Sequence, residues 1–231
     1  MEFAPLIDAA PLYASGLATT LQLLVAALAF GLVLALPLGV ARASSNAWLA
    51  WPVTAYTFVI RGTPMLVQLF VIYYGLAQFD AVRESVLWIG LKSAWFCAVL
   101  ALALNTAAYT AEIVAGAIRA TPAGEIEAAK SLGMSGTQTF LRIVLPSALK
   151  RALPAYSNEV IMMLHATSLA SLVTLVDLTG AARDVYSRTY LPFEAYITAG
   201  LIYLGLTLIL VHVFRRAEAR WLKHLAARPA N

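Results

Sequence analysis

The sequence predicts an all-α integral membrane protein with five transmembrane helices. Apolar residues occupy 61% of the 231 positions and charged residues only 12%. A soluble domain carries about 25% charged residues. The apolar residues also gather into runs of about 20 residues, the length that a helix needs to cross ~30 Å of hydrocarbon. The Lys and Arg residues lie mostly between these runs, where they indicate the orientation of the chain.

Five apolar runs are candidate spans. The three runs without Asp, Glu, Lys or Arg are residues 17–40, 93–111 and 195–214. The other two are long enough to span but carry polar groups: 51–79 contains Arg61, and 152–176 contains Glu159 and His165. The segment before the first run lacks the Lys or Arg of a cleaved signal peptide, so we expect the first helix to be retained.

The Lys and Arg residues outside the spans are divided unequally between the two sides of the membrane. Counted over alternate segments, one side collects eleven and the other four. The richer side includes the loop 118–151 and the tail after Phe214, with Lys223 and Arg228, and is expected to be cytoplasmic. This places the N-terminus outside and the C-terminus inside. The net charge of +4 then reflects topology and attraction to lipid, so we expect no nucleic-acid partner.

The sequence lacks the usual motifs of nucleotide, metal and hydrolytic sites. Gly133 and Gly136 are not followed by the Lys of a phosphate-binding loop, and neither H-E-x-x-H nor G-x-S-x-G occurs. The histidines are scattered and Cys97 is the single cysteine, so neither a metal site nor a disulfide is expected. We expect no cofactor bound by this chain. No repeat or linker divides residues 1–231, which are expected to form one domain.

The loop 118–151 predicts a short capped helix. Thr121 is a suitable N-cap, Pro122 suits the first turn, and Gly133 can end the helix in a left-handed conformation. Steps of three leave one apolar edge on this helix, formed by Ile126, Ala129 and Leu132. These residues alone are compatible with a helix that docks into a partner and equally with one that lies on the membrane surface.

A spaced pattern in this loop resembles a known family. The pattern consists of Glu127, Ala128, Ala129, Gly133, Ile143, Leu145 and Pro146. It resembles the EAA loop in the membrane subunits of bacterial ABC importers. The resemblance implies a coupling helix that fits into a cleft of a separate ATPase subunit, with ATP and Mg bound by that partner. It accounts for the lack of a phosphate-binding loop in the chain itself.

The resemblance extends over nearly the whole chain. Residues 61–69 and 108–113 are similar to signatures of the polar amino-acid uptake family. The segments most similar to the M-type membrane subunit of histidine/lysine/arginine/ornithine importers and its opine relatives are 125–129, 155–161, 163–165 and 214–218. The resemblance implies a multi-pass permease of the bacterial inner membrane, in contact with lipid. Its implied partners are a second permease, homologous or identical, two ATPase subunits and a periplasmic amino-acid-binding protein.

Polar side chains within the span 152–176 form a candidate substrate site. A carboxylate at membrane depth is costly and usually marks a pathway or a partner. Asn158 and His165 share a helix face, and Glu159 lies beside them in the sequence. The hypothesis is that Glu159, with Asn158, His165 and Arg61, lines a translocation path for a cationic amino acid. The alternative is a structural ion pair of Glu159 with Arg61 or with an arginine of a partner subunit.

Arg61 precedes a predicted break in the span 51–79. Pro64 removes a backbone donor and Gly62 loosens the turn, so a kink or break is expected. We favour a gating or structural role for Arg61 over direct contact with substrate. Glu112, at the inner end of the third span, is expected to be structural because Arg119 follows close by on the cytoplasmic side.

The resemblance favours a transporter subunit, rather than an enzyme, that translocates a basic amino acid such as arginine, ornithine, lysine or histidine. Another polar amino acid or an opine is the alternative within the same machinery. Two other classes are an ion-coupled transporter that uses Glu159 and Glu112, and an intramembrane enzyme that uses His165 with Glu159. Neither class explains the EAA spacing.

Overall fold

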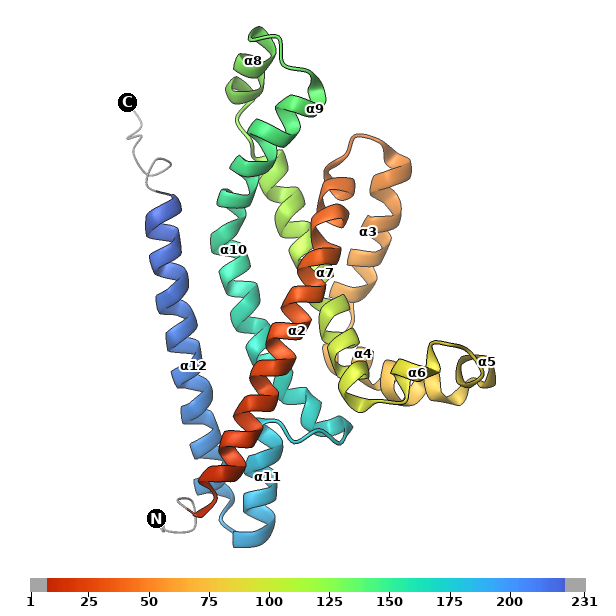
Figure 1. Cartoon of the computed structure of the whole chain (residues 1–231), viewed down its shortest axis with the longest axis vertical. Helices are drawn as coiled ribbons and strands as arrows, with labels where there is room; N and C mark the ends of the chain where they lie inside the picture. The colour runs from red at the N-terminus through yellow and green to blue at the C-terminus, as the bar shows by residue number, and fades with distance from the viewer. Residues whose placement is uncertain (1–7, 223–231) are drawn as a thin grey trace.

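The structure is a computed structural model that describes residues 8–222, and this part of the chain contains helices and no strand. Five long helices build most of it (Figure 1): α2 (Ala10–Ala43), α3 (Ala47–Gly62), α7 (Ala94–Arg119), α10 (Leu145–Ala166) and α12 (Pro192–Trp221). The shorter helices are α4 (Met65–Phe70), α5 (Asp80–Arg83), α6 (Trp88–Leu91), α8 (Ala123–Ser131), α9 (Gly136–Thr139) and α11 (Leu178–Thr189). The α5–α6 region projects sideways from the long helices.

Three of the predicted spans are confirmed as continuous helices. Residues 17–40 lie in α2, 93–111 lie almost entirely in α7, and 195–214 lie in α12. These three helices are long and apolar enough to cross a membrane. Two further spans exist only if each of two bent helix pairs is counted as one crossing.

The span 51–79 is not one helix, as the expected break at Pro64 indicated. Helix α3 ends at Gly62, α4 begins at Met65, and the two directions differ by 103°. Thr63 has an extended backbone, as a residue before proline prefers. Gln68 covers the break, because its Nε2 donates to the Ile60 carbonyl at 2.6 Å and to the Thr63 carbonyl at 3.0 Å.

The span 152–176 is also interrupted and is not one continuous helix. Helix α10 begins earlier, at Leu145, and ends at Ala166, where a 3-10 segment (Thr167–Val173) replaces it. Beyond a 49° bend, residues expected to form a loop instead form α11. The fully buried Asp177 begins this helix by accepting hydrogen bonds from the Thr179 and Gly180 amides. Asp is a favoured N-cap residue, so the sequence did contain a local signal for α11.

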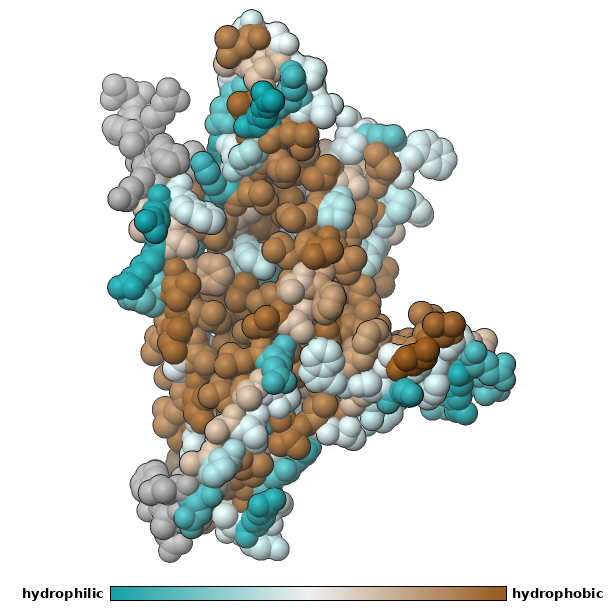
Figure 2. All heavy atoms as spheres, in the orientation of Figure 1, coloured by the Kyte–Doolittle hydropathy of each residue, from teal (hydrophilic) through white to brown (hydrophobic). Residues whose placement is uncertain are grey.

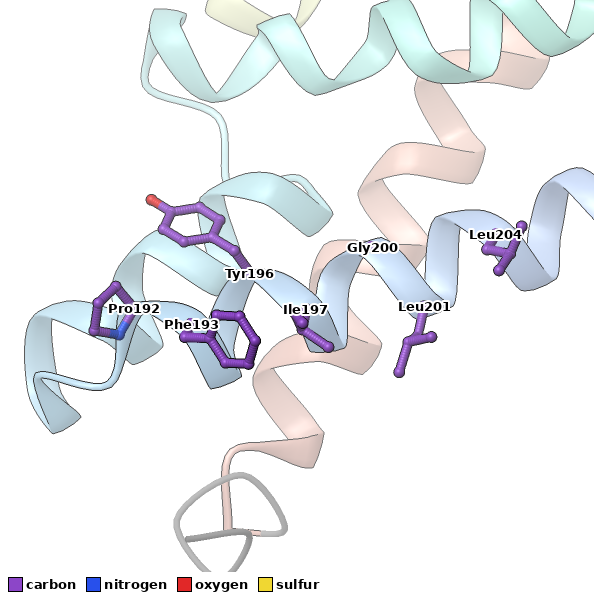
Figure 3. Close-up of a pocket in the computed structure, with 7 residues that line it drawn as sticks. All are labelled: Pro192, Phe193, Tyr196, Ile197, Gly200, Leu201 and Leu204. Atoms are coloured by element: carbon purple, nitrogen blue, oxygen red, sulfur yellow. The ribbon is translucent and has the colours of Figure 1, made fainter. Parts of the chain in front are cut away.

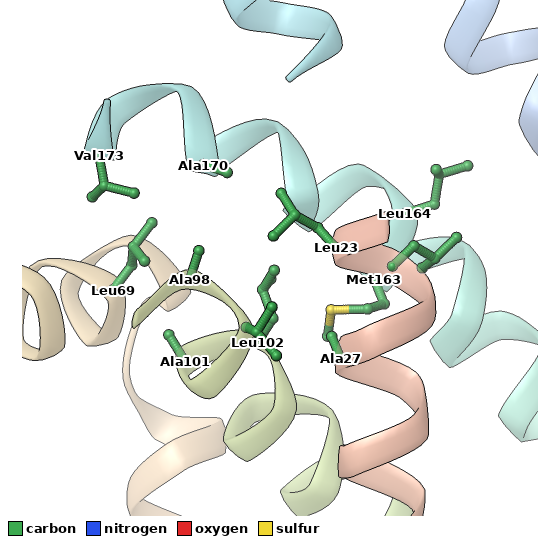
Figure 4. Packing of buried hydrophobic residues seen from close by; sticks show 12 residues of the cluster. Leu23, Ala27, Leu69, Ala98, Ala101, Leu102, Met163, Leu164, Ala170 and Val173 are labelled. Carbon is green, nitrogen blue, oxygen red and sulfur yellow. The ribbon is translucent and has the colours of Figure 1, made fainter. Parts of the chain in front are cut away.

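The hydrophobic core lies where α2, α4, α7 and α10 meet (Figure 4). Each helix contributes a leucine that is almost fully buried: Leu23, Leu69, Leu102 and Leu164. Small residues let α2 and α7 pack closely along their length; Gly31 on α2 faces Ala103 and Thr106 on α7. Close packing through small residues is the usual way in which membrane helices associate, because lipid supplies no hydrophobic drive between them.

Apolar side chains cover the middle of the visible face, and polar ones gather towards its ends (Figure 2). Helices α8 and α9 lie at the same end as the last turn of α12, opposite the start of α2 and α11 (Figure 1). The two Lys- and Arg-rich segments of the sequence, 118–151 and the start of the tail, therefore share one end of the molecule. Lys223 and Arg228 lie outside the described residues.

The close approach of α2 to α7 predicts that Gly31→Ala destabilises the protein. An added Cβ would overlap Thr106 Cγ2 and lie 3.2 Å from the Ala103 carbonyl oxygen. Overpacking of this kind costs about 1–3 kcal/mol. We expect a lower free energy of unfolding for the purified protein in detergent. Gly205→Ala on α12 is the control, since its Cβ would meet nothing within 4 Å; equal stability of the two variants would contradict the prediction.

Candidate functional site

Glu159 lies in the middle of α10 as a buried carboxylate, with 8% of the residue exposed. It forms no ion pair with any described residue. Thr106 on α7 is close enough to hydrogen-bond to the carboxylate, and Arg61 on α3 is near enough to act on it electrostatically. The Thr106 hydroxyl is buried and has no other hydrogen-bond partner in the described chain. The site therefore has a carboxylate on α10 and a hydroxyl on α7 that lie near each other, and no described cation pairs with the carboxylate.

Arg61 does not form the ion pair with Glu159 that the sequence left open. Its guanidinium lies over the ring of Tyr109 on α7, with 5.2 Å between the guanidinium carbon and the ring centroid. It is close enough to act electrostatically on both Glu112 and Glu159, but it lies within 4.0 Å of neither carboxylate. A cation–π contact of an exposed side chain is weak, of the order of 0.5–1 kcal/mol. Arg61 therefore lies near both carboxylates and forms an ion pair with neither.

Asn158 and His165 lie on the exposed side of α10, as their spacing predicted. His165 reaches Thr207 on α12, with 3.2 Å between His165 Nε2 and Thr207 Oγ1. It opens onto a hollow of about 320 Å³ lined by His165, Ser168, Thr179, Tyr196, Ala199, Gly200 and Tyr203. Glu159 is not part of this lining. The structure thus brings Arg61 near Glu159, leaves Asn158 exposed beside it, and directs His165 towards α12.

A second hollow, of about 730 Å³, follows the outer face of α12 (Figure 3). Its lining is Pro192, Phe193, Tyr196, Ile197, Gly200, Leu201 and Leu204. This lining offers no charged group for a polar ligand. Of the α12 residues, only Ala195 and Ala199 are buried. The face suits lipid chains or an apolar helix rather than an amino acid.

The helix expected in the loop 118–151 is present as α8. It ends at Ser131, and Gly133 follows with a φ of 75°, which confirms the predicted left-handed conformation. The Met134 amide donates to the Ala129 carbonyl at 3.1 Å, and the Gly133 amide donates to the Lys130 carbonyl at 2.9 Å. This paired arrangement satisfies carbonyls that the helix end would leave free, and only glycine adopts it without steric cost.

The predicted start and apolar edge of α8 were partly wrong. Pro122, with an extended ψ of 135°, occupies the N-cap position, so α8 begins later than expected and the Thr121 hydroxyl caps nothing. Ala129 is buried against the chain itself, whereas Leu132 is 81% exposed. The edge is therefore divided between an inner and an outer face.

The seven residues of the EAA-like pattern lie on or next to α8 and at the start of α10, including the π-helical segment before it. Glu127 and Ala128 are exposed on α8, and Gly133 follows the end of that helix. Ile143 lies in the π-helical segment Phe140–Val144, and Leu145 with Pro146 begins α10. The pattern thus marks a free helix face and the point at which the chain returns to the helix bundle.

Residues 27–223 match the family described as binding-protein-dependent transport system inner membrane component. The chain belongs to this family. It is 48% identical over 215 residues to the histidine/lysine/arginine/ornithine transport system permease protein HisM of Salmonella typhimurium, which covers 93% of this chain and 92% of that protein. It is 50% identical over 208 residues to the octopine transport system permease protein OccM of Rhizobium radiobacter, which covers 90% of this chain and 85% of that protein.

A solved structure resembles this inner membrane component closely. It is described as an amino acid ABC transporter with histidines, and the two chains superpose with a TM-score of 0.85 at 37% identity. The superposition covers 95% of this chain and 99% of the other. The ABC permease fold and the inner-membrane location expected from the sequence are thereby confirmed.

Two polar contacts of this permease were not foreseen. Glu112 pairs with Arg42 rather than Arg119: Arg42 Nε lies 2.7 Å from Glu112 Oε1, and the Thr57 hydroxyl donates to the same oxygen at 2.8 Å. Arg119 instead donates to the Arg42 carbonyl oxygen at 2.6 Å. The second contact joins Asn105 on α7 to Gln68 Oε1. Both contacts join separate helices, and no short sequence pattern indicates them.

The closed pair at Glu112 predicts that Glu112→Gln lowers stability. The substitution keeps the shape but removes the charge opposite Arg42, and a hydrogen bond to a charged group is worth about 1.5–3 kcal/mol. We expect a lower unfolding temperature in detergent. Glu84→Gln is the matched control, because Glu84 is exposed and has no ion pair among the described residues. An unchanged unfolding temperature would show that the pair is not structural.

Proposed function

We propose that this chain is the membrane-spanning subunit of an ATP-driven importer that carries a basic amino acid across the inner membrane. A periplasmic binding protein delivers the amino acid. The proposal is supported by the family, by the names of the similar permeases and by the amino acid transporter with the same fold. In this proposal the chain crosses the membrane five times, with the N-terminus outside and the C-terminus inside.

The observation that carries the choice of substrate is Glu159, a buried carboxylate with no ion pair among the described residues. An isolated carboxylate in an apolar interior is costly unless a cation or hydrogen-bond donors reach it. Thr106 offers one hydroxyl beside it, and the guanidinium of Arg61 lies over the Tyr109 ring instead. A cationic side chain or α-amino group that enters this site can pair with the Glu159 carboxylate, because Arg61 does not form an ion pair with it. Asn158, exposed on the adjacent face of α10, supplies a further hydrogen-bonding group.

The driving force comes from outside this chain. Helix α8 presents Glu127 and Ala128 to a separate ATPase subunit, which binds ATP and Mg. Closure of a pair of such subunits displaces α8, which follows α7 after residues 120–122 and returns to α10 through Ile143, Leu145 and Pro146. Because α10 carries Glu159 and α7 holds Arg61 through Tyr109, this displacement changes which side of the membrane reaches the site.

A second permease, homologous or identical, completes the pathway. Glu159 and Asn158 lie on one helix of a small bundle, and α10 leaves Asn158, Met162 and His165 exposed. Polar side chains on an exposed face within a membrane helix favour a protein or aqueous neighbour over lipid. Octopine is the alternative cargo, since the OccM permease shares half of its aligned residues with this chain. Octopine also carries a guanidinium group, which the same carboxylate would bind.

The proposed role of Glu159 predicts that Glu159→Gln impairs transport of basic amino acids. Loss of a charged contact worth about 1.5–3 kcal/mol lowers uptake at subsaturating substrate by roughly 10-fold or more. The measurement is uptake of labelled arginine into vesicles that contain the assembled transporter and its binding protein. Glu84→Gln is the control. Unchanged uptake by Glu159→Gln would contradict a substrate contact, whereas uptake that needs no ATPase would contradict the transporter class.

The proposed role of α8 predicts a difference between two neighbouring glycine substitutions. Gly133→Ala forces a side chain into the left-handed region, at a cost of the order of 1–3 kcal/mol. We expect it to weaken co-purification with the ATPase subunit and to lower ATP-driven uptake. Gly136→Ala is the control, because Gly136 does not have a positive φ and an added Cβ would meet nothing within 4 Å. Equal behaviour of both variants would argue against coupling through α8.

A further inference from the structure

A three-residue polar contact joins α8 to the beginning of α10. Arg151 Nη2 lies 2.7 Å from Glu125 Oε1 and donates a second hydrogen bond to the Ser147 hydroxyl at 2.9 Å. The Ser147 hydroxyl in turn donates to Glu125 Oε2 at 3.1 Å. Each residue thus contacts the other two. The Glu125, Ser147 and Arg151 side chains are called the clamp below.

We infer that the clamp passes the movement of α8 to α10, and that its three members are positioning residues for coupling. The inference rests on the proposed function of α8 as the element that receives the force. Among the described residues, no other side-chain hydrogen bond joins α8 to α10. Glu125 sits in the first turn of α8, next to the connection from α7. A push on α8 therefore reaches α7 through the backbone and α10 through the clamp.

The clamp is partly buried and rests on a closely packed base. The side chain of Arg151 is 19% exposed and that of Glu125 is 36% exposed. Such a pair is screened less by water and salt than an ion pair on the open surface. At the neighbouring positions of α10, Ala148 and Ala152 pack against Ala117 of α7. Because Ser147 and Arg151 are four residues apart, they face Glu125 from the same side of α10.

The position of the clamp on α10 connects it to the substrate site. Helix α10 runs from Leu145 to Ala166 and includes both Arg151 and Glu159. The two residues are about 12 Å apart along the helix axis, at 1.5 Å per residue. A displacement of the clamped end is therefore carried along one helix to the carboxylate.

The clamp also contains a spare donor that permits a second pairing. Arg151 Nε is buried and has no hydrogen-bond partner in the described chain, because only Nη2 contacts Glu125. A carboxylate and a guanidinium bind most strongly side by side, through two parallel hydrogen bonds. A small shift of α8 would let Glu125 engage Nε as well as Nη2. The clamp can therefore stay closed while α8 moves, as a transmission contact requires.

The test measures how many substrate molecules are imported for each ATP hydrolysed by the complete transporter in vesicles. The variants are Glu125→Gln and Arg151→Gln. We expect the ATPase subunits to remain bound and hydrolysis to continue, while substrate carried per ATP falls at least about fivefold, the lower range of measured couplings between sites. Lys150→Gln is the control for lost positive charge, since Lys150 is exposed and outside the clamp.

A charge exchange separates transmission from simple stabilisation. The double variant Glu125→Arg with Arg151→Glu restores the ion pair and is expected to recover part of the coupling. If Glu125→Gln does not fold, Arg151→Lys, which keeps the charge but loses the forked contact, provides the measurement. Normal substrate carried per ATP in the variants, or loss of the ATPase subunit from a folded complex, would overturn the inference. Failure of the unmodified complex to use ATP for uptake would instead overturn the proposed function.

Discussion

Hydrocarbon offers no hydrogen bonds, so backbone groups inside the apolar belt must find their partners within the protein. The break between α3 and α4 meets this requirement through Gln68, which donates to carbonyls at the end of α3 and accepts from Asn105 on α7. The start of α11 meets it through Asp177. At both interruptions, side chains thus take over hydrogen bonds that a continuous helix would make through its backbone. An apolar substitution at either residue would leave backbone groups free in an environment that cannot solvate them.

The same constraint separates the two carboxylates on α7 and α10. Glu112 is paired with Arg42 and hydrogen-bonded by Thr57. These contacts give it a structural role near the end of a membrane helix, so no transport role is needed to explain it. Glu159 is more deeply buried and forms no ion pair within the part of the chain that the structure describes. Arg61 lies near both and is held by the ring of Tyr109 instead. The difference between a satisfied and an unsatisfied carboxylate separates a structural ion pair from a candidate binding site.

In the proposed importer, force from a separate ATPase subunit passes through a small piece of this chain. Helix α8 is only nine residues long, and it is fixed at its end by Gly133 and near its start by Glu125. A short element of this kind has few internal degrees of freedom to absorb a displacement. The alanines between α7 and α10 bring the two receiving helices close together at the same level. The loop between the third and fourth predicted spans is therefore an ordered helical element with defined contacts to the bundle.

The sequence by itself determined the apolar helices around 17–40, 93–111 and 195–214, the break before Pro64 and the left-handed end of α8 at Gly133. Each depends on preference for solvent or on backbone sterics, which a few neighbouring residues specify. The tertiary structure alone decided that Glu112 pairs with Arg42, 70 residues away, and that Glu125 meets Arg151, 26 residues away. It also decided that Glu159 forms no ion pair with any described residue. Partner choice depends on how three helices pack against one another, and no short window of sequence contains that information.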